Sequence, residues 1–311
     1  MSSDFEGGNG GVLAPDDAFS ALGNETRMEI LQALGEAGEP LTFSELRERV
    51  GMRDSGQFNY HLDQVRGHFV RSTEEGYDLQ QAGRRVIEAV LSGAVTEEPD
   101  LAPTEIDWPC PYCGATTEVM YDVRTSRPLK LYCTECAGPE MTWEPFEHGQ
   151  LAALRFSPAG LRGRTPLEIF QAAATWEHLE NLAAYRGVCP RCSGRIDHSI
   201  SVCASHDATD DACAHCGRRY AIQHDSRCTN CIFDLEAGFA ANLLLGSIEM
   251  LAFLTDHGIN PLTDAWGPII ESADETVLST DPLRARFTFT IEDDHLILTV
   301  DETLSVLDSQ R

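Results

Sequence analysis

Eleven cysteines, all of them after residue 109, constrain this chain more than any other feature of its sequence. Ten of them form Cys-x-x-Cys pairs, and the eleventh, Cys203, stands three residues before His206. Residues 1–8 carry neither the basic segment nor the apolar segment that begins a secretion signal. We therefore expect the thiols to stay reduced in the cytoplasm, where paired cysteines usually bind a metal ion.

The first four cysteines form two pairs with 19 residues between them: Cys110, Cys113, Cys133 and Cys136. The intervening runs at 117–122 and 129–132 have the composition of strands, which is the arrangement of a zinc ribbon. Two Cys-x-x-Cys turns on a hairpin place four thiolates around one tetrahedral ion. The spacing therefore predicts a closed, structural zinc site. Disulfides, thioredoxin-like redox chemistry and an iron–sulfur cluster are the alternatives.

A second, denser cluster contains eight candidate ligands, which are Cys189, Cys192, Cys203, His206, Cys213, Cys216, Cys228 and Cys231. Its seven cysteines cannot complete two four-ligand sites, so His206 is expected to supply the eighth ligand. The ligand pairs can combine in sequence order, or the first pair can join the third, and the sequence does not choose between these pairings. We expect three zinc ions in all. His198, His215 and His224 are expected to be surface residues.

Acidic residues dominate the charged side chains: 50 Asp and Glu face 23 Lys and Arg, for a formal net charge of −27. The chain has one lysine, Lys130, beside 22 arginines. Carboxylates retain water and cations at high salt, whereas lysine adds a long apolar stem, so the composition favours a halophile's cytosol over an acidic mesophilic protein. It also excludes an ordinary basic nucleic-acid binder. The apolar stretch at 237–254 contains Asn242 and Glu249, which favours a buried helix over a membrane span.

Changes in composition divide the chain into segments, and the expected fold class is α+β. Residues 1–14 are expected to be disordered, residues 15–92 to form a helical domain without cysteine, and residues 93–107 to be a linker. The zinc ribbon then covers 108–146, and an α+β domain covers 147–311. Within that domain the cluster at 187–232 is inserted between helices expected at 166–185 and 233–257, and alternating runs at 284–291 and 295–300 predict a hairpin.

The N-terminal segment carries three successive helix starts. Asn24 can cap one helix, Thr42 with Glu45 forms a capping box for a second, and Asp54 with Gln57 opens a third. In the third helix the apolar residues recur at i, i+4 and i+7, and they are Phe58, Leu62 and Val65. Short strands at 69–72 and 76–79 and a helix at 81–91 complete the order of a winged helix-turn-helix.

Two stretches of this segment resemble ArsR-like winged-helix regulators in the version common among halophilic archaea. Residues 19–31 match their opening pattern of Phe-x-x-Leu-x-x-x-x-Arg-x-x-Ile-Leu, and residues 54–62 resemble their recognition helix. The remainder of the chain resembles an uncharacterised zinc-ribbon region often found behind such domains.

The resemblance implies a dimer that inserts the recognition helix into the major groove of double-stranded DNA, with the wing on the backbone. When the family's contact positions are carried over to this sequence, the expected DNA-contacting residues are Arg53, Ser55, Gln57, Asn59 and Tyr60. Gln and Asn pair with adenine edges, whereas Ser and Tyr more often bind phosphates. The function implied is sequence-specific transcriptional regulation, with a C-terminal domain for dimerisation or for an effector of unknown identity.

Two features depart from the family's pattern. Glu74 and Glu75 occupy the wing tip, where a basic residue would bind phosphate, and the helix at 42–50 lacks the cysteine pair of arsenic-type sensors. We find no Ser-His-Asp signature, phosphate loop or dinucleotide fingerprint, so an enzyme is not expected. The alternatives are a zinc-ribbon adaptor of the transcription machinery, and a zinc or redox sensor that uses Cys203 and His206 as a labile site.

Overall fold

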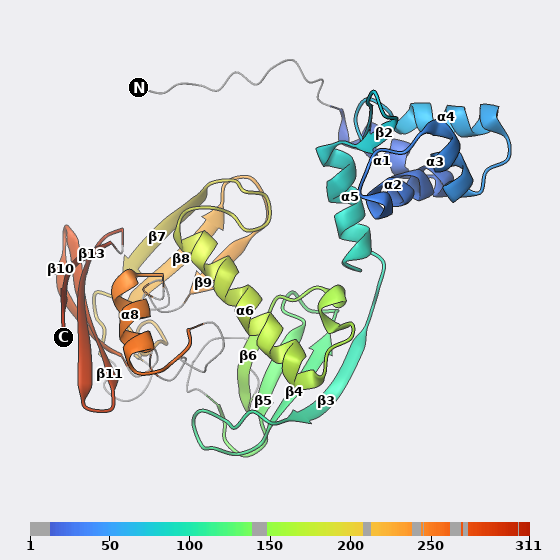
Figure 1. Ribbon diagram of the computed structural model, residues 1–311. Helices are drawn as coiled ribbons and strands as arrows, with labels where there is room; N and C mark the ends of the chain where they lie inside the picture. The colour runs from blue at the N-terminus through green and yellow to red at the C-terminus, as the bar shows by residue number, and fades with distance from the viewer. Residues whose placement is uncertain are drawn as a thin grey trace. The chain divides into compact units, whose positions relative to one another are not determined.

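The computed structural model describes residues 13–138, 148–207, 213–237, 244, 246–261, 269, 273–303 and 305–311 (Figure 1). The chain divides into two compact units, residues 1–97 and residues 98–311. The described residues form α-helices and four small antiparallel sheets, which confirms the expected mixture of helix and strand. Within those residues no helix is both long and apolar enough to cross a membrane.

The first unit consists of short helices and one hairpin, which are α1 (Pro15–Leu22), α2 (Glu25–Ala37), α3 (Phe43–Val50), α4 (Ser55–Val65), β1 (Val70–Ser72), β2 (Tyr77–Leu79) and α5 (Gln81–Leu91). The three predicted helix starts are confirmed. The side chain of Asn24 accepts a hydrogen bond from the Arg27 amide, and that of Asp54 accepts one of 2.8 Å from the Gln57 amide. Thr42 and Glu45 form the complete capping box. Each cap satisfies amides that the first helical turn leaves without partners.

The core of the first unit lies between α2, α3 and α4. Phe58, Leu62 and Val65, the predicted apolar stripe of α4, are fully buried against Ile30 and Leu46. The aromatic ring of Phe43 meets that of Phe58 edge to face at 5.1 Å between centroids. Because this stripe is buried along its whole length, the opposite face of α4 is presented to solvent.

A four-stranded sheet begins the second unit, with the strand order β3 (Asp100–Ile106), β4 (Thr117–Asp122), β5 (Leu129–Cys133) and β6 (Gln150–Leu154). A 3₁₀ turn, η1 (Pro158–Leu161), leads into the long helix α6 (Pro166–Tyr185). The helix packs Ile169, Phe170 and Ala173 onto Val119 and Leu131 of the sheet. Figure 1 shows α6 running along this sheet.

Part of the expected linker is a strand. Residues 100–106 pair with β4, so the ribbon expected at 108–146 is the centre of a larger sheet that β3 and β6 flank. The composition that indicated a linker includes Pro103, which has no amide hydrogen to donate. A proline is tolerated in an edge strand, and the register shifts by a bulge between Leu101 and Thr104 around it.

Three further strands carry the second cysteine cluster: β7 (Ile196–Val202), β8 (Ile222–Cys228) and β9 (Asp234–Ala237). The helix expected at 233–257 is therefore wrong over its first residues, which pair with β8 instead. Phe233 and Leu235 are buried and Asp234 is exposed, an alternation with the period of a strand. The end of the expected helix is confirmed as α8 (Ile248–Asp256), whereas residues 238–243 and 245 of it lie outside the described residues.

The C-terminal sheet is an antiparallel meander of β10 (Asp274–Thr280), β11 (Leu283–Ile291), β12 (Asp294–Asp301) and β13 (Val306–Gln310). It confirms the predicted hairpin, which is formed by β11 and β12. Helix α8 buries Met250, Phe253 and Leu254 in one cluster with Phe287 and Phe289 of the sheet. Ile222 of β8 belongs to the same cluster, so this core also holds one end of the cysteine-bearing hairpin.

Candidate metal centres

The structure gathers all twelve predicted metal ligands into three groups of four. Site A contains Cys110, Cys113, Cys133 and Cys136. Site B contains Cys189, Cys192, Cys228 and Cys231, and site C contains Cys203, His206, Cys213 and Cys216. Each group can hold a metal ion.

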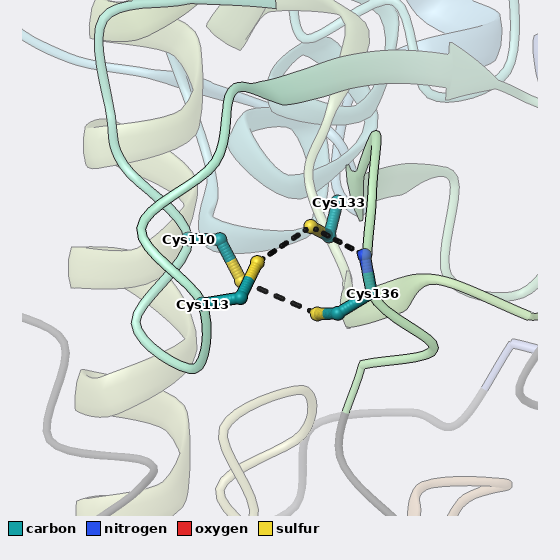
Figure 2. A group of neighbouring side chains, drawn as sticks. All are labelled: Cys110, Cys113, Cys133 and Cys136. Carbon is teal, nitrogen blue, oxygen red and sulfur yellow. Dashed lines mark hydrogen bonds between the residues drawn. The ribbon is translucent and has the colours of Figure 1, made fainter.

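Site A lies at the end of the β4–β5 hairpin, where its four thiols converge (Figure 2). The sulfur of Cys113 is 3.5 Å from that of Cys133, and the sulfur of Cys110 is 3.7 Å from that of Cys136. Four sulfurs at about 2.3 Å from a tetrahedral zinc ion stand about 3.8 Å apart. A disulfide would bring two sulfurs to about 2.05 Å, so the distances fit a tetrahedral metal site and not a pair of disulfides.

Three of the cysteine turns have the same backbone hydrogen bonds. The amide of Gly114 donates to the carbonyl of Cys110, and the amide of Cys110 donates to the carbonyl of Ala115, each at 2.8 Å. The turns that begin at Cys189 and Cys213 repeat both bonds. The residue after the second cysteine is left-handed in each, at Gly114, Ser193 and Gly217. This backbone turn holds both sulfurs of the pair on one side before any ion binds.

Hydrogen bonds around the sulfur of Cys192 favour its thiolate form. At site B the Gly194 amide donates to the Cys192 sulfur at 3.4 Å. A hydrogen bond from the Asn230 side chain, this amide and the neighbouring thiols lower the pKa of Cys192 to about 6. Since a metal binds the thiolate, this environment favours metal binding at neutral pH.

Sites B and C combine the ligand pairs in a way that neither predicted pairing describes. The first pair joins the fourth at site B, and the second joins the third at site C, so the two sites are nested. The cause is the antiparallel pairing of β7 with β8, in which Ile196 lies opposite Cys228 and Val202 lies opposite Ile222. One ligand pair precedes and one follows each strand, so the hairpin brings the outer pairs together at one end and the inner pairs together at the other.

His206 is placed as a metal ligand by its own hydrogen bond. Its Nδ1 is 3.6 Å from the sulfur of Cys216, and its Nε2 is 2.9 Å from the carbonyl oxygen of Arg219. A carbonyl accepts a hydrogen bond only from a protonated Nε2. The lone pair of Nδ1 is then free to bind an ion, in the arrangement that orients metal-bound histidines generally.

The three histidines expected at the surface differ from one another. His215 is exposed, whereas His224 is 2% exposed on β8, and its burial lowers its pKa to about 4. His198 Nδ1 lies 2.8 Å from the Ser226 hydroxyl and 3.3 Å from Nε2 of His224. The expectation is therefore wrong for His224, because the face of β8 that carries it is turned into the unit.

Sequence reasoning missed a buried group of charges between site B and α6. Arg191, inside the first cysteine turn of site B, forms an ion pair of 2.8 Å with Glu180, and Arg127 forms one of 3.1 Å with Glu177. Both glutamates are at least 90% buried, and burial raises the pKa of Glu180. The two carboxylates tie the turn between β4 and β5 and the site B turn to one helix. A pair of glutamates three residues apart on an apolar helix was the only local sign of this arrangement.

The five predicted DNA contacts all lie on the first unit, apart from the metal ligands. Arg53 precedes α4, and Ser55, Gln57, Asn59 and Tyr60 lie on it, and all five are exposed. Tyr60 is 60% exposed. The side-chain Nδ2 of Asn59 donates a hydrogen bond to the carboxylate of Asp63 at 3.0 Å. The structure thus leaves all five side chains exposed along and just before α4, and Tyr60 lies on the side of the helix away from its buried stripe.

Comparison with known proteins gives two family matches. Residues 15–90 match the model described as Domain of unknown function (DUF7347). No match is found among curated proteins or among solved structures. Residues 107–306 match the model described as Domain of unknown function (DUF7351), and because this match spans more than half of the chain, the chain belongs to that family.

Proposed function

We propose that this protein is a sequence-specific, DNA-binding transcriptional regulator with a winged helix in its first unit and three structural zinc ions in its second. The observation that carries the proposal is the exposed polar face of α4, whose other face is buried along its whole length. In this proposal α4 is the recognition helix and the β1–β2 hairpin is the wing.

The chemistry of the α4 face supports base recognition. Gln57 and Asn59 provide amides that can donate to and accept from adenine, and Arg53, Ser55 and Tyr60 provide phosphate ligands. The Asp54 cap at the start of α4 and the buried Phe58 hold the helix in place. A face presented by a rigid helix keeps such contacts in register along a groove.

Charge is unevenly distributed within the first unit, and the distribution favours DNA binding at the exposed face of α4. Residues 47–66 contain four arginines and three carboxylates, whereas residues 16–46 contain one arginine and seven carboxylates. Asp63, the acidic residue in the last turn of α4, forms an ion pair of 2.7 Å with Arg66. The stretch around α3 and α4 is therefore the part of this unit that repels a phosphate backbone least.

The hairpin contributes less positive charge. Arg71 is paired with Asp78 at 2.6 Å, and Glu74 and Glu75 are exposed at the tip. Ordinary release of counterions from DNA therefore cannot dominate binding. We expect cations to be taken up between the carboxylates and the DNA, so that affinity stays flat or rises with KCl concentration.

In this proposal zinc ions stabilise the second unit. The species that binds DNA is a homodimer. The closed sets of four ligands at sites A, B and C leave no position for a substrate, which is the property of structural rather than catalytic zinc. Apolar side chains on α1 and at the end of α5, Phe19 and Leu91, are exposed and supply surface for a second copy.

The test is selection of bound duplexes from a random DNA pool by the zinc-loaded full-length protein at several molar KCl. An enriched palindrome is expected, and Gln57→Ala with Asn59→Ala is expected to abolish its enrichment. Gln32→Ala, at an exposed position of α2, is the matched control and should leave the selected sequence unchanged.

Two results contradict the proposal. One is a folded, zinc-loaded protein that enriches no sequence, which would favour the adaptor that contacts other proteins. The other is enrichment that survives the double variant, which would place base recognition elsewhere. If the affinity for DNA falls steeply as the KCl concentration rises, only the proposed uptake of cations is contradicted, and the proposal of sequence-specific binding stands.

A further inference from the structure

The end of the β7–β8 hairpin that carries site C holds more ligand-type side chains than one ion requires. Asp207, Cys213 and His215 form a second group whose ligand atoms all lie within 4.8 Å of one another. Nδ1 of His215 is 3.8 Å from Oδ2 of Asp207. Cys213 belongs both to this group and to site C, so an oxygen, a nitrogen and a shared sulfur converge there.

The three donors differ in their access to solvent. The side chains of Asp207 and His215 are 53% and 60% exposed, whereas Cys213 is 2% exposed. The group is therefore open on its carboxylate and imidazole side and closed on its sulfur side. An ion bound by these three ligands keeps a position for water, and such an open position is the feature that separates reactive sites from closed structural ones.

Local hydrogen bonds hold the group on the same turn as site C. Oδ1 of Asp207 accepts a hydrogen bond of 3.1 Å from the Ala214 amide, and the His215 amide donates to the Cys213 sulfur at 3.4 Å. The other carboxylate oxygen of Asp207 and the His215 ring are left facing one another. Among the described residues, no ligand of site A or site B belongs to a second group of this kind.

We propose that Asp207, Cys213 and His215 form a second metal position beside site C, in which the Cys213 thiolate bridges two ions. Sulfur with nitrogen and oxygen donors suits a borderline divalent cation such as Zn²⁺, Co²⁺ or Cd²⁺, whereas Ca²⁺ and Mg²⁺ take oxygen ligands. The inference concerns site C alone and does not depend on whether α4 binds DNA.

The chemistry of the step is an exchange of ligands without oxidation or reduction. A hydrated ion loses water molecules and gains bonds to Asp207, His215 and a second lone pair of the Cys213 sulfur. The bond from this sulfur to the ion of site C weakens as the new bond forms. Either ion can then leave, which makes site C the place where bound zinc exchanges with zinc in solution.

Cadmium-113 NMR of the full-length protein tests the proposal directly. Three equivalents of cadmium are expected to give the resonances of sites A, B and C, and further cadmium is expected to give a fourth. Two cadmium nuclei joined by one sulfur are scalar coupled, so the fourth resonance and that of site C should split each other. The double variant Asp207→Asn with His215→Asn should lose the fourth resonance and the splitting and keep the other three.

The matched control makes the same two chemical changes elsewhere, with Asp308→Asn and His295→Asn on the C-terminal sheet, and it should keep all four resonances. If the double variant also loses the site C resonance, the single variant His215→Asn is measured instead, because His215 is not one of the four ligands of site C. It should lose the fourth resonance and keep that of site C. The proposal is overturned if excess cadmium gives three resonances only, or if a fourth appears without splitting and survives in the variants.

Discussion

The first unit and the site B end of the β7–β8 hairpin differ in what fills the space between their elements. In the first unit 13 buried apolar side chains form one cluster around Phe58. The cluster beside site B has five buried residues, and one of them, Cys189, is itself a metal ligand. A cluster of that size supplies little hydrophobic stabilisation, so metal bonds must replace it. The comparison teaches that one chain can stabilise its two parts by different interactions, and that each part should then respond to a different perturbation.

Removal of metal should produce the largest difference between the two regions. A structural zinc ion contributes about 10–16 kcal/mol of binding energy that becomes folding energy. Chelation of the full-length protein is therefore expected to abolish protection from hydrogen exchange at the site B end of β7 and β8, where Ile196 pairs with Cys228, and to leave α2 and α4 protected. Exchange measured by mass spectrometry separates these segments. Equal loss of protection in α2 and α4 would show that the first unit depends on the metal as well.

Phe58→Ala should reverse the pattern. The ring is fully buried, and removal of a buried phenylalanine costs about 3–5 kcal/mol. The first unit is expected to unfold at lower urea concentration, while the zinc content stays at its original value. Denaturation followed together with metal release tests this expectation. Tyr60→Ala, on the exposed face of the same helix, is the control and should change the stability of the first unit little.

Glu275→Gln should make the second unit more stable at alkaline pH. Burial raises the pKa of Glu275 to about 7, and the carboxylate accepts hydrogen bonds from the Ala221 and Ile222 amides at 2.8 and 3.3 Å. A carboxyl whose pKa is higher in the folded state loses stability as pH rises from its unfolded pKa to its folded pKa. The loss between pH 5 and pH 8 is about 2–3 kcal/mol.

The glutamine of the variant has no proton to lose and stays neutral, so the stability advantage of the variant over the original protein should grow through that pH range. Thermal unfolding at matched pH values measures the difference, and comparison at each pH removes effects of pH on the zinc sites. Glu302→Gln, in the exposed turn between β12 and β13, is the control and should show no such trend. An advantage that is independent of pH would mean that the Glu275 carboxyl does not titrate in this range.

The features that the sequence predicted correctly are local. A cap at Asn24 or Asp54 joins a side chain to an amide three residues away, and a Cys-x-x-Cys turn places two ligands on one short loop. The fold class, the stripe on α4 and the β11–β12 hairpin follow from patterns of the same short range. The strand at 100–106 was missed because an edge strand tolerates proline and looks like a linker in composition.

The features that could not be predicted depend on distant segments. The pairing of ligands at sites B and C is decided by the register of β7 with β8, although ligand pairs at both ends of two seven-residue strands were a sign of it. The buried Glu177 and Glu180 need Arg127 and Arg191, which reach them from other elements. The partners are 50 and 11 residues apart, well beyond the spacings of three and four at which side chains on one helix meet.

Ser193→Gly should have the smallest effect of these substitutions, a small change in the zinc affinity of site B. Its effect tests whether the cysteine turns differ in backbone strain. Ser193 has φ of 58°, whereas glycine occupies the corresponding left-handed positions after Cys113 and Cys216. A side chain in this region costs about 1 kcal/mol, so the variant should stabilise site B by up to about that amount. Gly217→Ala should weaken site C by a similar amount, because it introduces the strain that Ser193 already has. Competition with a chelator measures both changes as shifts in zinc affinity. If Ser193→Gly weakens site B instead, then the Ser193 side chain contributes contacts that outweigh its backbone strain.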